Sequence, residues 1–576
     1  MGWLRSTAAW LRAHPGVTAI ACLGVCWGLT MHAMGWAQLA HYAQVRAFAS
    51  GSAEIDRWHW QTNDKAWVDG HFYSVKSPGV AGLSVPAYLL FDTAAGRDIA
   101  ETMAENARET NYPRWTSDNS PSIQNYGYDP ERADRVAAQT ERNAPLIWGL
   151  TLIAAVIPAV LLLLGVRWAA DRFEPGYGTA AAITLGVGSI VMIFASEYFS
   201  HVISAALGFG AFLLLMRERE GAPRPWMVGV AGLLAGLAVT FEYQVGLVGA
   251  VLFFYALARA ERRLRRAFLY AAGALAGALP ALAFNWWALG SPFEFAYGNA
   301  VDTPGFTGHE TLGLNDDGFF GITAPKATSA IDLLLANRGL LVLTPVIAAA
   351  VAGIVLLWRR GDRVAEARTI AAIGAIYFVY NAGYWLPFGG GSPGPRFLIP
   401  ALPFVALGLA VAYRRLPAIT LGLAIPSALM MVAGAISFPL LGEQGTGEWA
   451  RFIGDGRLEH TVLTGLGVSN AWLAIAPVLA AVAAAIVLAF RATPPTPLGD
   501  LRPALGAVVG WAAIAAVGPT IAGDRTRPLE GDSALILIAL AAGISLVTLG
   551  VLGLRERSSQ PEAAVRPGAV LGESSP

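Results

Sequence analysis

Long runs without a charged residue constrain this chain more than any other feature of its sequence. Residues 180–196 read AAAITLGVGSIVMIFAS and residues 471–490 read AWLAIAPVLAAVAAAIVLAF. An α-helix needs about 20 apolar residues to cross the roughly 30 Å hydrocarbon core of a bilayer. The runs do not alternate as barrel strands do, so helices are the way for this backbone to be satisfied in lipid. The sequence therefore predicts an all-α polytopic membrane protein.

The composition narrows the class further. Of the 576 residues 55% are hydrophobic and 14% charged, and the 40 basic side chains balance the 40 acidic ones. A chain without excess positive charge gives no electrostatic case for a nucleic-acid partner. Cys22 and Cys26 lie in the first apolar run and are expected to be small core residues, since metal sites need more ligands. That run follows Arg5 and Arg12 but is too long for a signal peptide, so we expect a retained first span.

About fourteen segments are apolar enough to be candidate spans. They are residues 17–36, 145–166, 179–195, 201–216, 226–241, 244–258, 267–288, 339–358, 369–387, 397–412, 417–439, 469–490, 503–522 and 533–553.

Arginines mark alternate connections between these spans, and by the positive-inside rule those connections face the cytoplasm. The arginines are Arg217, Arg219, Arg224, Arg259, Arg262, Arg263, Arg265, Arg266, Arg359, Arg360, Arg363, Arg368, Arg414 and Arg415. The long polar regions 37–143 and 289–338, and the shorter one at 440–468, are then extracytoplasmic.

Residues 79–95 do not fit this alternation of cytoplasmic and extracytoplasmic connections. They are apolar, but they are short, contain Pro86, and would place the basic connections on opposite sides if they crossed. We expect an embedded or interfacial helix that does not cross. The alternative, a short span with residues 96–143 in the cytoplasm, stays open.

The expected organisation has three parts. Residues 1–440 form a transmembrane catalytic module with external loops 37–143 and 289–338. Residues 441–554 add C-terminal transmembrane helices, and residues 555–576, rich in Ser, Pro and Glu, are expected to be a disordered cytoplasmic tail. Turn-forming residues at 111–134 predict a loop flanked by two helical stretches.

The first external region interleaves acids with aromatic residues. Glu54, Asp56, Asp64 and Asp69 alternate with Trp58, Trp60, Trp67 and Tyr73. Sugars offer hydroxyls to carboxylates and CH faces to rings, so the pattern indicates a carbohydrate site. A solvated loop anchored at the membrane interface by its tryptophans would contain the same residues.

Three stretches resemble the GT-C fold of integral-membrane glycosyltransferases, which includes protein O-mannosyltransferases and the aminoarabinose transferases of lipid A. They are FYSVKSPG (72–79), FNWWALGSPFEFAYGN (284–299) with the loop that follows it, and YNAGYWLPFGGGSPGPRFLIPALPFVAL (380–407). The resemblance covers roughly residues 10–410. One departure is the absence of any carboxylate from Gly35 to Gln44, where family members often carry the catalytic aspartate.

The resemblance implies a membrane glycosyltransferase that moves a sugar, with inversion, from a polyprenyl-phosphate donor to an extracytoplasmic acceptor. The acceptor, whether a glycan, a lipid or a protein, and the sugar, hexose or pentose, stay open. The expected location is the bacterial inner membrane, and the expected role of the enzyme is in building the cell envelope. No cofactor is certain, and a divalent metal stays open.

Such a transfer needs a general base near the acceptor hydroxyl and cations near the leaving phosphate. Asp56, in EIDRW, is the predicted base, and Asp64 and Asp69 are the next candidates or acceptors for sugar hydroxyls. Lys76, just before the apolar segment, and Arg396 are predicted phosphate ligands. A snorkelling lysine and an ion-paired arginine are the simpler interpretations.

Further polar residues are candidate substrate contacts. His71 and Tyr73 lie in the same stretch as Lys76. Glu197 and His201 lie four apart on one helical face at the outer boundary, where two ligands leave a metal site open. Glu242 ends a span, where an unpaired carboxylate would be costly, so it is a functional candidate.

A transporter and an inert scaffold are the alternatives to a glycosyltransferase. A transporter or flippase of a lipid-linked envelope precursor would also be a large helical bundle with Gly/Pro-broken helices. Against it, the polar residues concentrate on one face, and no inverted repeat is evident. An inert scaffold for envelope assembly would have no need of the lysine-proline element.

Overall fold

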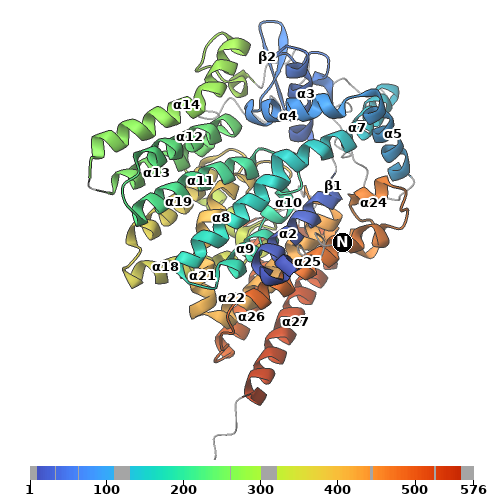
Figure 1. The fold of residues 1–576 in the computed structure, drawn as a ribbon. Helices are drawn as coiled ribbons and strands as arrows, with labels where there is room; N and C mark the ends of the chain where they lie inside the picture. The colour runs from blue at the N-terminus through green and yellow to red at the C-terminus, as the bar shows by residue number, and fades with distance from the viewer. Residues whose placement is uncertain are drawn as a thin grey trace, which may run out of the picture.

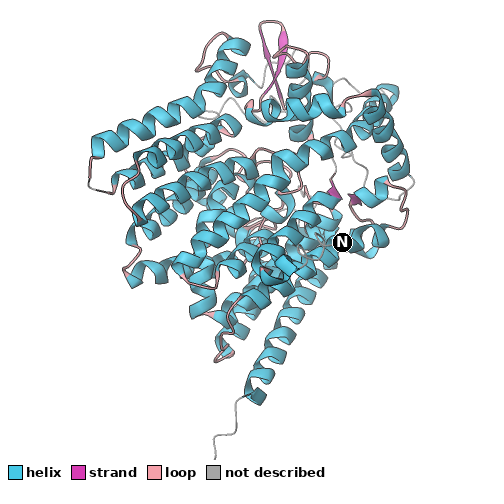
Figure 2. Ribbon diagram, viewed as in Figure 1, coloured by secondary structure: helices cyan, strands magenta, loops and turns pink. Residues whose placement is uncertain are grey.

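The computed structural model describes residues 9–32, 34–62, 64–108, 130–259, 261–299, 321–440, 445–523 and 527–559. Within this part of the chain, helices form nearly all of the regular structure, and four short strands form two two-stranded sheets (Figure 2). The predicted all-α polytopic fold is confirmed.

The N-terminal half contains twelve of the described α-helices. They are α2 (Pro15–Leu29), α3 (Trp36–Ala49), α4 (Gly79–Phe91), α5 (Ala94–Arg108), α7 (Pro130–Thr151), α8 (Ile157–Phe173), α9 (Gly178–Val187), α10 (Val191–Phe194), α11 (His201–Glu220), α12 (Pro225–Phe241), α13 (Gly246–Leu257) and α14 (Arg263–Leu289).

The C-terminal half continues the bundle. Its α-helices are α16 (Ala327–Leu335), α17 (Leu340–Leu343), α18 (Val346–Arg360), α19 (Val364–Gly383), α20 (Leu402–Val405), α21 (Leu407–Arg415), α22 (Pro417–Ser437), α23 (Gly447–Gly454), α24 (Val462–Gly465), α25 (Ala471–Ala492), α26 (Arg502–Ile521) and α27 (Arg527–Ser559). Along the whole described chain there are also four 3₁₀-helices, η1 (His59–Gln61), η3 (Tyr243–Val245), η4 (Ala296–Asn299) and η5 (Arg396–Ala401), and one π-helix, η2 (Leu152–Val156).

The structure does not confirm the number of spans that the sequence predicts. Among the described residues, seven helices are long and apolar enough to cross a membrane, and nine if two bent pairs each count as one span. The pairs are Ala327–Leu343 with Val346–Arg360, bent by 90°, and Arg396–Val405 with Leu407–Arg415, bent by 53°. Five further apolar helices have 10–17 residues, so the predicted count of about fourteen is not confirmed.

The first span ends earlier than the expected residue 36. After Leu29 the chain leaves the helix, and β1 (Thr30–Met31) pairs antiparallel with β4 (His460–Thr461). Thr30 lies opposite Thr461, more than four hundred residues away in the chain. Hydropathy detects an apolar run but not a distant strand partner, which explains the difference. Of the two cysteines of this helix, Cys26 is buried, as expected, and Cys22 is half-buried.

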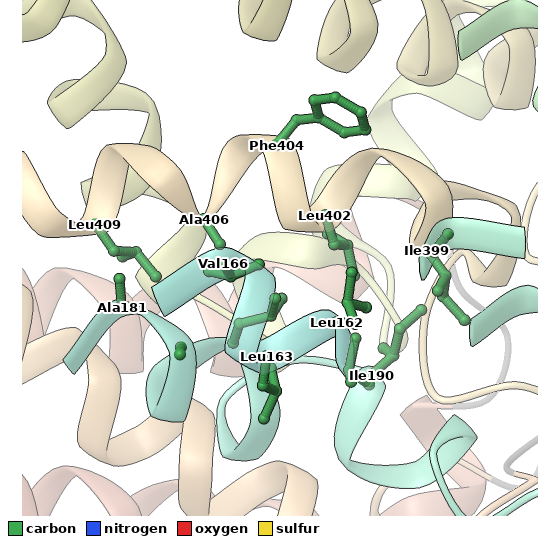
Figure 3. Packing of buried hydrophobic residues seen from close by; sticks show 14 of the residues in the cluster. Leu162, Leu163, Val166, Ala181, Ile190, Ile399, Leu402, Phe404, Ala406 and Leu409 are labelled. Atoms are coloured by element: carbon green, nitrogen blue, oxygen red, sulfur yellow. The ribbon is translucent and has the colours of Figure 1, made fainter. Parts of the chain in front are cut away.

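One apolar core runs through the bundle. Figure 3 shows Ala181 of α9 beside Leu409 of α21, and Leu162 of α8 beside Leu402 of α20, all in this core. The C-terminal helices join it, since α2 packs against α25 and Trp511 of α26 donates a hydrogen bond to the carbonyl of Val342 (3.0 Å). The division at residue 440 stays a prediction.

The expected tail begins as helix, since α27 continues to Ser559, and residues 560–576 lie outside the described part. The two helices expected on either side of the 111–134 loop are present as α5 and α7. Residues 111–129 of that loop also lie outside the described part.

A β-hairpin stands at one end of the molecule with α3 and α4, far from the end of α27 (Figure 1). It consists of β2 (Lys65–Val68) and β3 (His71–Ser74). The turn residues Asp69 and Gly70 have φ of 49° and 90°, the positive values of a type I′ turn, which Asp-Gly adopts readily. Side chains of the hairpin pack in a small apolar cluster that also contains Phe284 of α14 and Ala296 of η4.

Helix α4 follows this hairpin and corresponds to segment 79–95, which did not fit the alternation of basic connections. Its 13 residues would extend about 20 Å at 1.5 Å per residue, less than the roughly 30 Å of hydrocarbon. This length agrees with a helix that does not cross, and its position in the membrane stays a prediction.

Helices α12 and α14 approach closely through glycines. A Cβ on Gly277 would lie 2.2 Å from the carbonyl oxygen of Leu233, and one on Gly236 would lie 1.9 Å from that of Ala274. Small residues at helix contacts let backbones pack against each other in lipid, where no hydrophobic force drives the helices together.

We expect Gly277→Leu to destabilise the folded protein by roughly 1–3 kcal/mol or more, because backbone atoms of the facing helix cannot move aside as a flexible side chain can. The midpoint of thermal unfolding in detergent measures this effect. Ala276→Leu, at an exposed position of the same helix, is the matched control and should leave the midpoint within about a degree. Equal midpoints for the two variants would contradict the packing described here.

Candidate functional site

An ion pair between Lys76 and Asp64 lies at the base of the hairpin. Lys76 Nζ is 2.7 Å from Asp64 Oδ2, and the two side chains are 20% and 12% exposed. Asp64 directly precedes β2 and Lys76 follows β3, while Lys65 pairs with Ser74 in the ladder. The register of the hairpin therefore brings an acid and a cation together from positions twelve apart in sequence.

Arg396, the first residue of η5, supplies a second cation. It interacts electrostatically with Asp64 and with Glu242. Its guanidinium lies 5.2 Å from the ring centroid of Phe199 and 5.5 Å from that of Phe397, and its Nε is buried without a hydrogen-bond partner.

The glycine-rich segment before Arg396 closes over this guanidinium. Gly389 has φ of 80°, and a Cβ there would lie 2.7 Å from Arg396 Nε. A side chain at this position would meet both strain and a clash, so glycine is what allows the segment to approach the arginine.

His201 is oriented by Glu242. Its Nδ1 lies 2.6 Å from Glu242 Oε1, while Ser204 Oγ donates to Glu242 Oε2 over 2.7 Å and Gln244 donates as well. Since Ser204 and Gln244 both donate to this carboxylate, Nδ1 is the donor in a neutral His201 and Nε2 is left as an acceptor. Nε2 is buried without a hydrogen-bond partner.

Helix α3 contributes two side chains that sequence analysis missed. His41 is 1% exposed, and its Nδ1 has no hydrogen-bond partner. It interacts electrostatically with Lys76, His201 and Asp64. Gln44 donates to the carbonyl of Lys76 (3.3 Å), and its own Oε1 is buried and unpartnered.

A signal for these residues was present in the sequence. Gln38, His41 and Gln44 recur every third position in GWAQLAHYAQ, so they share one face of a helix. A polar face on a helix buried along most of its length indicates a site, because unsatisfied polar groups in a protein interior are costly.

Four buried polar atoms without hydrogen-bond partners therefore belong to this one neighbourhood: Nδ1 of His41, Oε1 of Gln44, Nε2 of His201 and Nε of Arg396. More than nine in ten buried polar groups in proteins have a partner. Donors and acceptors left open beside an acid and two cations are what a polar, anionic ligand would satisfy.

Aromatic side chains line the same neighbourhood. Tyr384 packs edge-on against Phe397, with ring centroids 5.2 Å apart, and stacks on Tyr380 at 5.9 Å. The hydroxyl of Tyr384 hydrogen-bonds that of Tyr297, and both tyrosines interact electrostatically with Arg396. The rings could contact the CH faces of a sugar and exclude water from the charges.

Asp56 and His71 lie at the opposite end of the hairpin. Asp56 Oδ2 is 2.8 Å from His71 Nδ1, and both side chains are more than 40% exposed. The pKa of His71 is raised, first by this hydrogen bond and then by the charges of Glu54 and Asp56. His71 pairs with Val68, which is four residues from Asp64 along the chain, so this pair is roughly 13 Å along the hairpin from Asp64.

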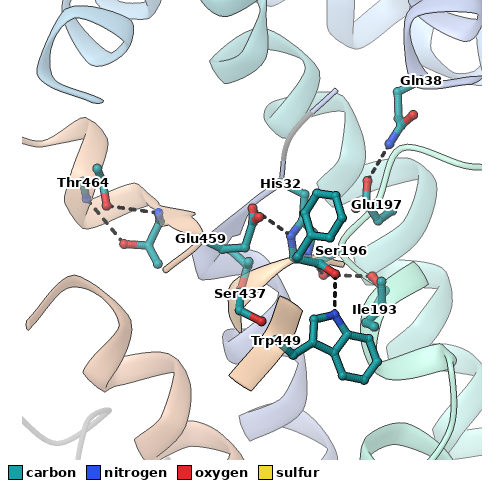
Figure 4. Close-up of polar contacts among 12 residues, drawn as sticks. His32, Gln38, Ile193, Ser196, Glu197, Ser437, Trp449, Glu459 and Thr464 are labelled. Carbon is teal, nitrogen blue, oxygen red and sulfur yellow. Dashed lines mark hydrogen bonds and ion pairs between the residues drawn. The ribbon is translucent and has the colours of Figure 1, made fainter. Parts of the chain in front are cut away.

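The remaining candidates occupy three other positions. Asp69 forms the hairpin turn, and Tyr73 packs in the apolar cluster that fixes the hairpin to α14. Glu197 is 1% exposed and accepts a hydrogen bond from Gln38 Nε2 (2.8 Å), as Figure 4 shows. Figure 4 also shows the adjoining contact of His32 with Glu459. The structure thus brings together Asp64, Lys76, Arg396, His201 and Glu242, while the others lie around them or apart.

These features define a polytopic helical membrane protein with a buried site of acid, cations and aromatic rings at one end. No family model matches the chain, and no curated protein sequence matches it.

The solved structures that are similar to it include two of ArnT from Cupriavidus metallidurans. The structure bound to undecaprenyl phosphate is 13% identical with a TM-score of 0.46, and the apo structure is 14% identical with a TM-score of 0.45. Each comparison covers 94% of this chain and 78% of the other.

Lys65 makes the free energy of unfolding depend measurably on pH. Its side chain is 1% exposed, Nζ donates to the carbonyl of His59 (2.9 Å), and burial lowers its pKa to about 7. Between that value and about 10.4 the unfolded chain binds a proton on Lys65 that the folded chain has released. The free energy of unfolding therefore rises with pH in this window, by at most about 1.4 kcal/mol per unit.

We expect the midpoint of thermal unfolding to rise from pH 7 to pH 9, and we expect Lys65→Met to remove most of that rise. Lys326→Met, at an exposed lysine, should retain it. If the two variants show the same pH dependence, the buried amine is not its source.

Proposed function

We propose that this protein is a membrane glycosyltransferase that takes a sugar from a polyprenyl-phosphate carrier and transfers it to an extracytoplasmic acceptor with inversion. The observation that carries the proposal is the convergence of Asp64, Lys76 and Arg396 beside unpartnered buried polar atoms. An acid and two cations in one partly water-excluded place are what such a transfer requires.

The proposed step forms one bond and breaks another at the anomeric carbon. The acceptor hydroxyl oxygen bonds to that carbon, while the bond from the carbon to the phosphate oxygen breaks. The hydroxyl proton goes to a carboxylate, and the electron pair of the broken bond stays on the polyprenyl phosphate. No oxidant or further reactant is needed.

Lys76 and Arg396 are the proposed phosphate ligands. Lys76 precedes α4 and its pair with Asp64 is partly exposed, so a lipid phosphate could compete with Asp64 for it. Arg396 has a planar fork suited to two phosphate oxygens. His201, oriented by Glu242, presents Nε2 to the same neighbourhood and would accept a hydrogen bond from a sugar hydroxyl.

Asp64 is the proposed base. It touches Lys76 and interacts with Arg396, so a carboxylate released by phosphate binding would lie beside the reacting centre. Asp56, the base that the sequence predicts, hydrogen-bonds His71 and the backbone of Phe72 at the far end of the hairpin. Its role as the base stays a prediction, and the geometry favours Asp64.

The remaining assignments extend the proposal. The aromatic residues Tyr380, Tyr384 and Phe397 would hold the sugar, and membrane lipid would surround the carrier chain. We place the enzyme in the inner membrane of a bacterium, with this site on the extracytoplasmic side and the arginine-rich connections in the cytoplasm. The proposed step needs no divalent metal.

Donor binding can be tested with undecaprenyl phosphate, the lipid in one of the ArnT structures, by titrating the detergent-purified protein. We expect Lys76→Ala and Arg396→Ala each to weaken binding by tenfold or more, since each removes a charged hydrogen bond worth roughly 1.5–3 kcal/mol. Lys326→Ala, an exposed lysine in the other long polar region, should leave it unchanged. Binding that is unaffected by either site variant contradicts the phosphate assignment.

The base can be tested separately in membranes supplied with undecaprenyl-phosphate sugars. We expect Asp64→Asn to retain undecaprenyl phosphate binding and to lower transfer by about 10² to 10⁴. If Asp56→Asn abolishes transfer while Asp64→Asn preserves it, the base is Asp56. Movement of the intact lipid-linked sugar across the bilayer without transfer would instead indicate a flippase.

A further inference from the structure

The exposed end of the hairpin carries a second cluster of side chains that the transfer step does not use. Glu54, Asp56 and His71 each present one ligand atom, and these three atoms lie within 4.8 Å of one another. Within the described part of the chain, no other group of three or more His, Cys, Asp or Glu residues meets this condition.

Two separate segments hold these ligands in place. Asp56 Oδ1 accepts a hydrogen bond from the backbone N–H of Phe72 (2.6 Å), which leaves Oδ2 directed at His71 Nδ1 (2.8 Å). Ile55, between the two acids, donates its N–H to the carbonyl of Phe72 (2.7 Å). Glu54 Oε2 lies 3.5 Å from the same His71 nitrogen. The turn that bears both acids is therefore fixed against the strand that bears the histidine.

The spacing suits a small metal ion. Two ligand atoms at 2.0–2.1 Å from a tetrahedral zinc ion lie roughly 3.4 Å apart. The two carboxylate oxygens lie 2.8 Å and 3.5 Å from His71 Nδ1, so small side-chain adjustments give this geometry.

The donor chemistry indicates which metal ions fit. One imidazole nitrogen and two carboxylates suit zinc or manganese, whereas calcium prefers six or more oxygen ligands. A divalent cation at this position would bind Nδ1 of His71 and both carboxylates.

We propose that Glu54, Asp56 and His71 bind one divalent transition-metal ion of the zinc or manganese class at the exposed end of the hairpin. The ion crosslinks the 54–56 turn to β3, the strand that leads to Lys76. Because the three ligands are partly exposed, water completes the coordination. This site is separate from the Asp64 site and does not depend on the proposed transfer.

The test uses the full-length protein in detergent, stripped with EDTA and titrated with Zn²⁺ by calorimetry. We expect one equivalent to bind in the wild-type protein, and His71→Gln and Asp56→Asn each to weaken binding tenfold or more. His71→Cys, which replaces one zinc ligand by another, should restore it. Glu105→Gln, an exposed acid outside the cluster, is the matched control and should bind like wild type.

Thermal unfolding provides a second readout that is independent of activity. Zn²⁺ should raise the unfolding midpoint of the wild-type protein and of His71→Cys, but not that of His71→Gln, because a ligand bound to the folded state stabilises it. The midpoints of the metal-free variants show that each is folded. Affinity should fall at low pH, because protons compete with the metal ion for its ligands.

The proposal is wrong if the wild-type protein binds no Zn²⁺, or if His71→Gln and Asp56→Asn bind it as tightly as wild type does. It is also wrong if the bound equivalent is lost in His41→Gln or His201→Gln and kept in His71→Gln, because the metal then lies at the Asp64 site.

Discussion

The ion pair between Asp64 and Lys76 is the contact on which the site depends, and the register of one short hairpin sets it. Lys65 pairs with Ser74, and the N–H of Val75 continues the ladder to the carbonyl of Asp64. A slip of one residue would turn alternate side chains to the other face and separate the two charges. The Asp-Gly turn at one end of the hairpin and its packing against α14 fix that register.

The other polar groups of the site are held by the ends of helices. Glu242 follows the last residue of α12 and holds His201, the first residue of α11, while Ser77 donates to the carbonyl of Phe241. A Cβ on Gly79 would lie 2.7 Å from the carbonyl oxygen of Thr240, so the start of α4 packs directly on the end of α12. Helix ends supply both polar backbone groups and abrupt changes of direction, so polar chemistry can collect there without breaking hydrogen bonds inside a span.

Much of the fold could be predicted because a helix in lipid satisfies its backbone locally. Each expected span from residue 145 onward overlaps one or more observed helices. The breaks were not predicted. These breaks depend on neighbouring helices as well as on local sequence. They are the π-helix Leu152–Val156 before Pro158, the separation of α9 from α10 and the bend before α21. The early end of α2 depends on β4, near the other end of the chain.

The sequence by itself determined the class of protein and the chemical types in its site, because hydropathy, an Asp-Gly turn, a lysine and a run of acids are local properties. It pointed to Asp64, Lys76, Arg396, His201 and Glu242, but it ranked Asp56 above Asp64 and passed over His41 and Gln44. Only the tertiary structure decided which of these meet, since Asp64 and Arg396 are more than three hundred residues apart and interact through folding alone. Burial decided the rest: the carboxylate of Asp56 is exposed at one end of the hairpin, whereas that of Asp64, at the other end, interacts with Lys76 and Arg396.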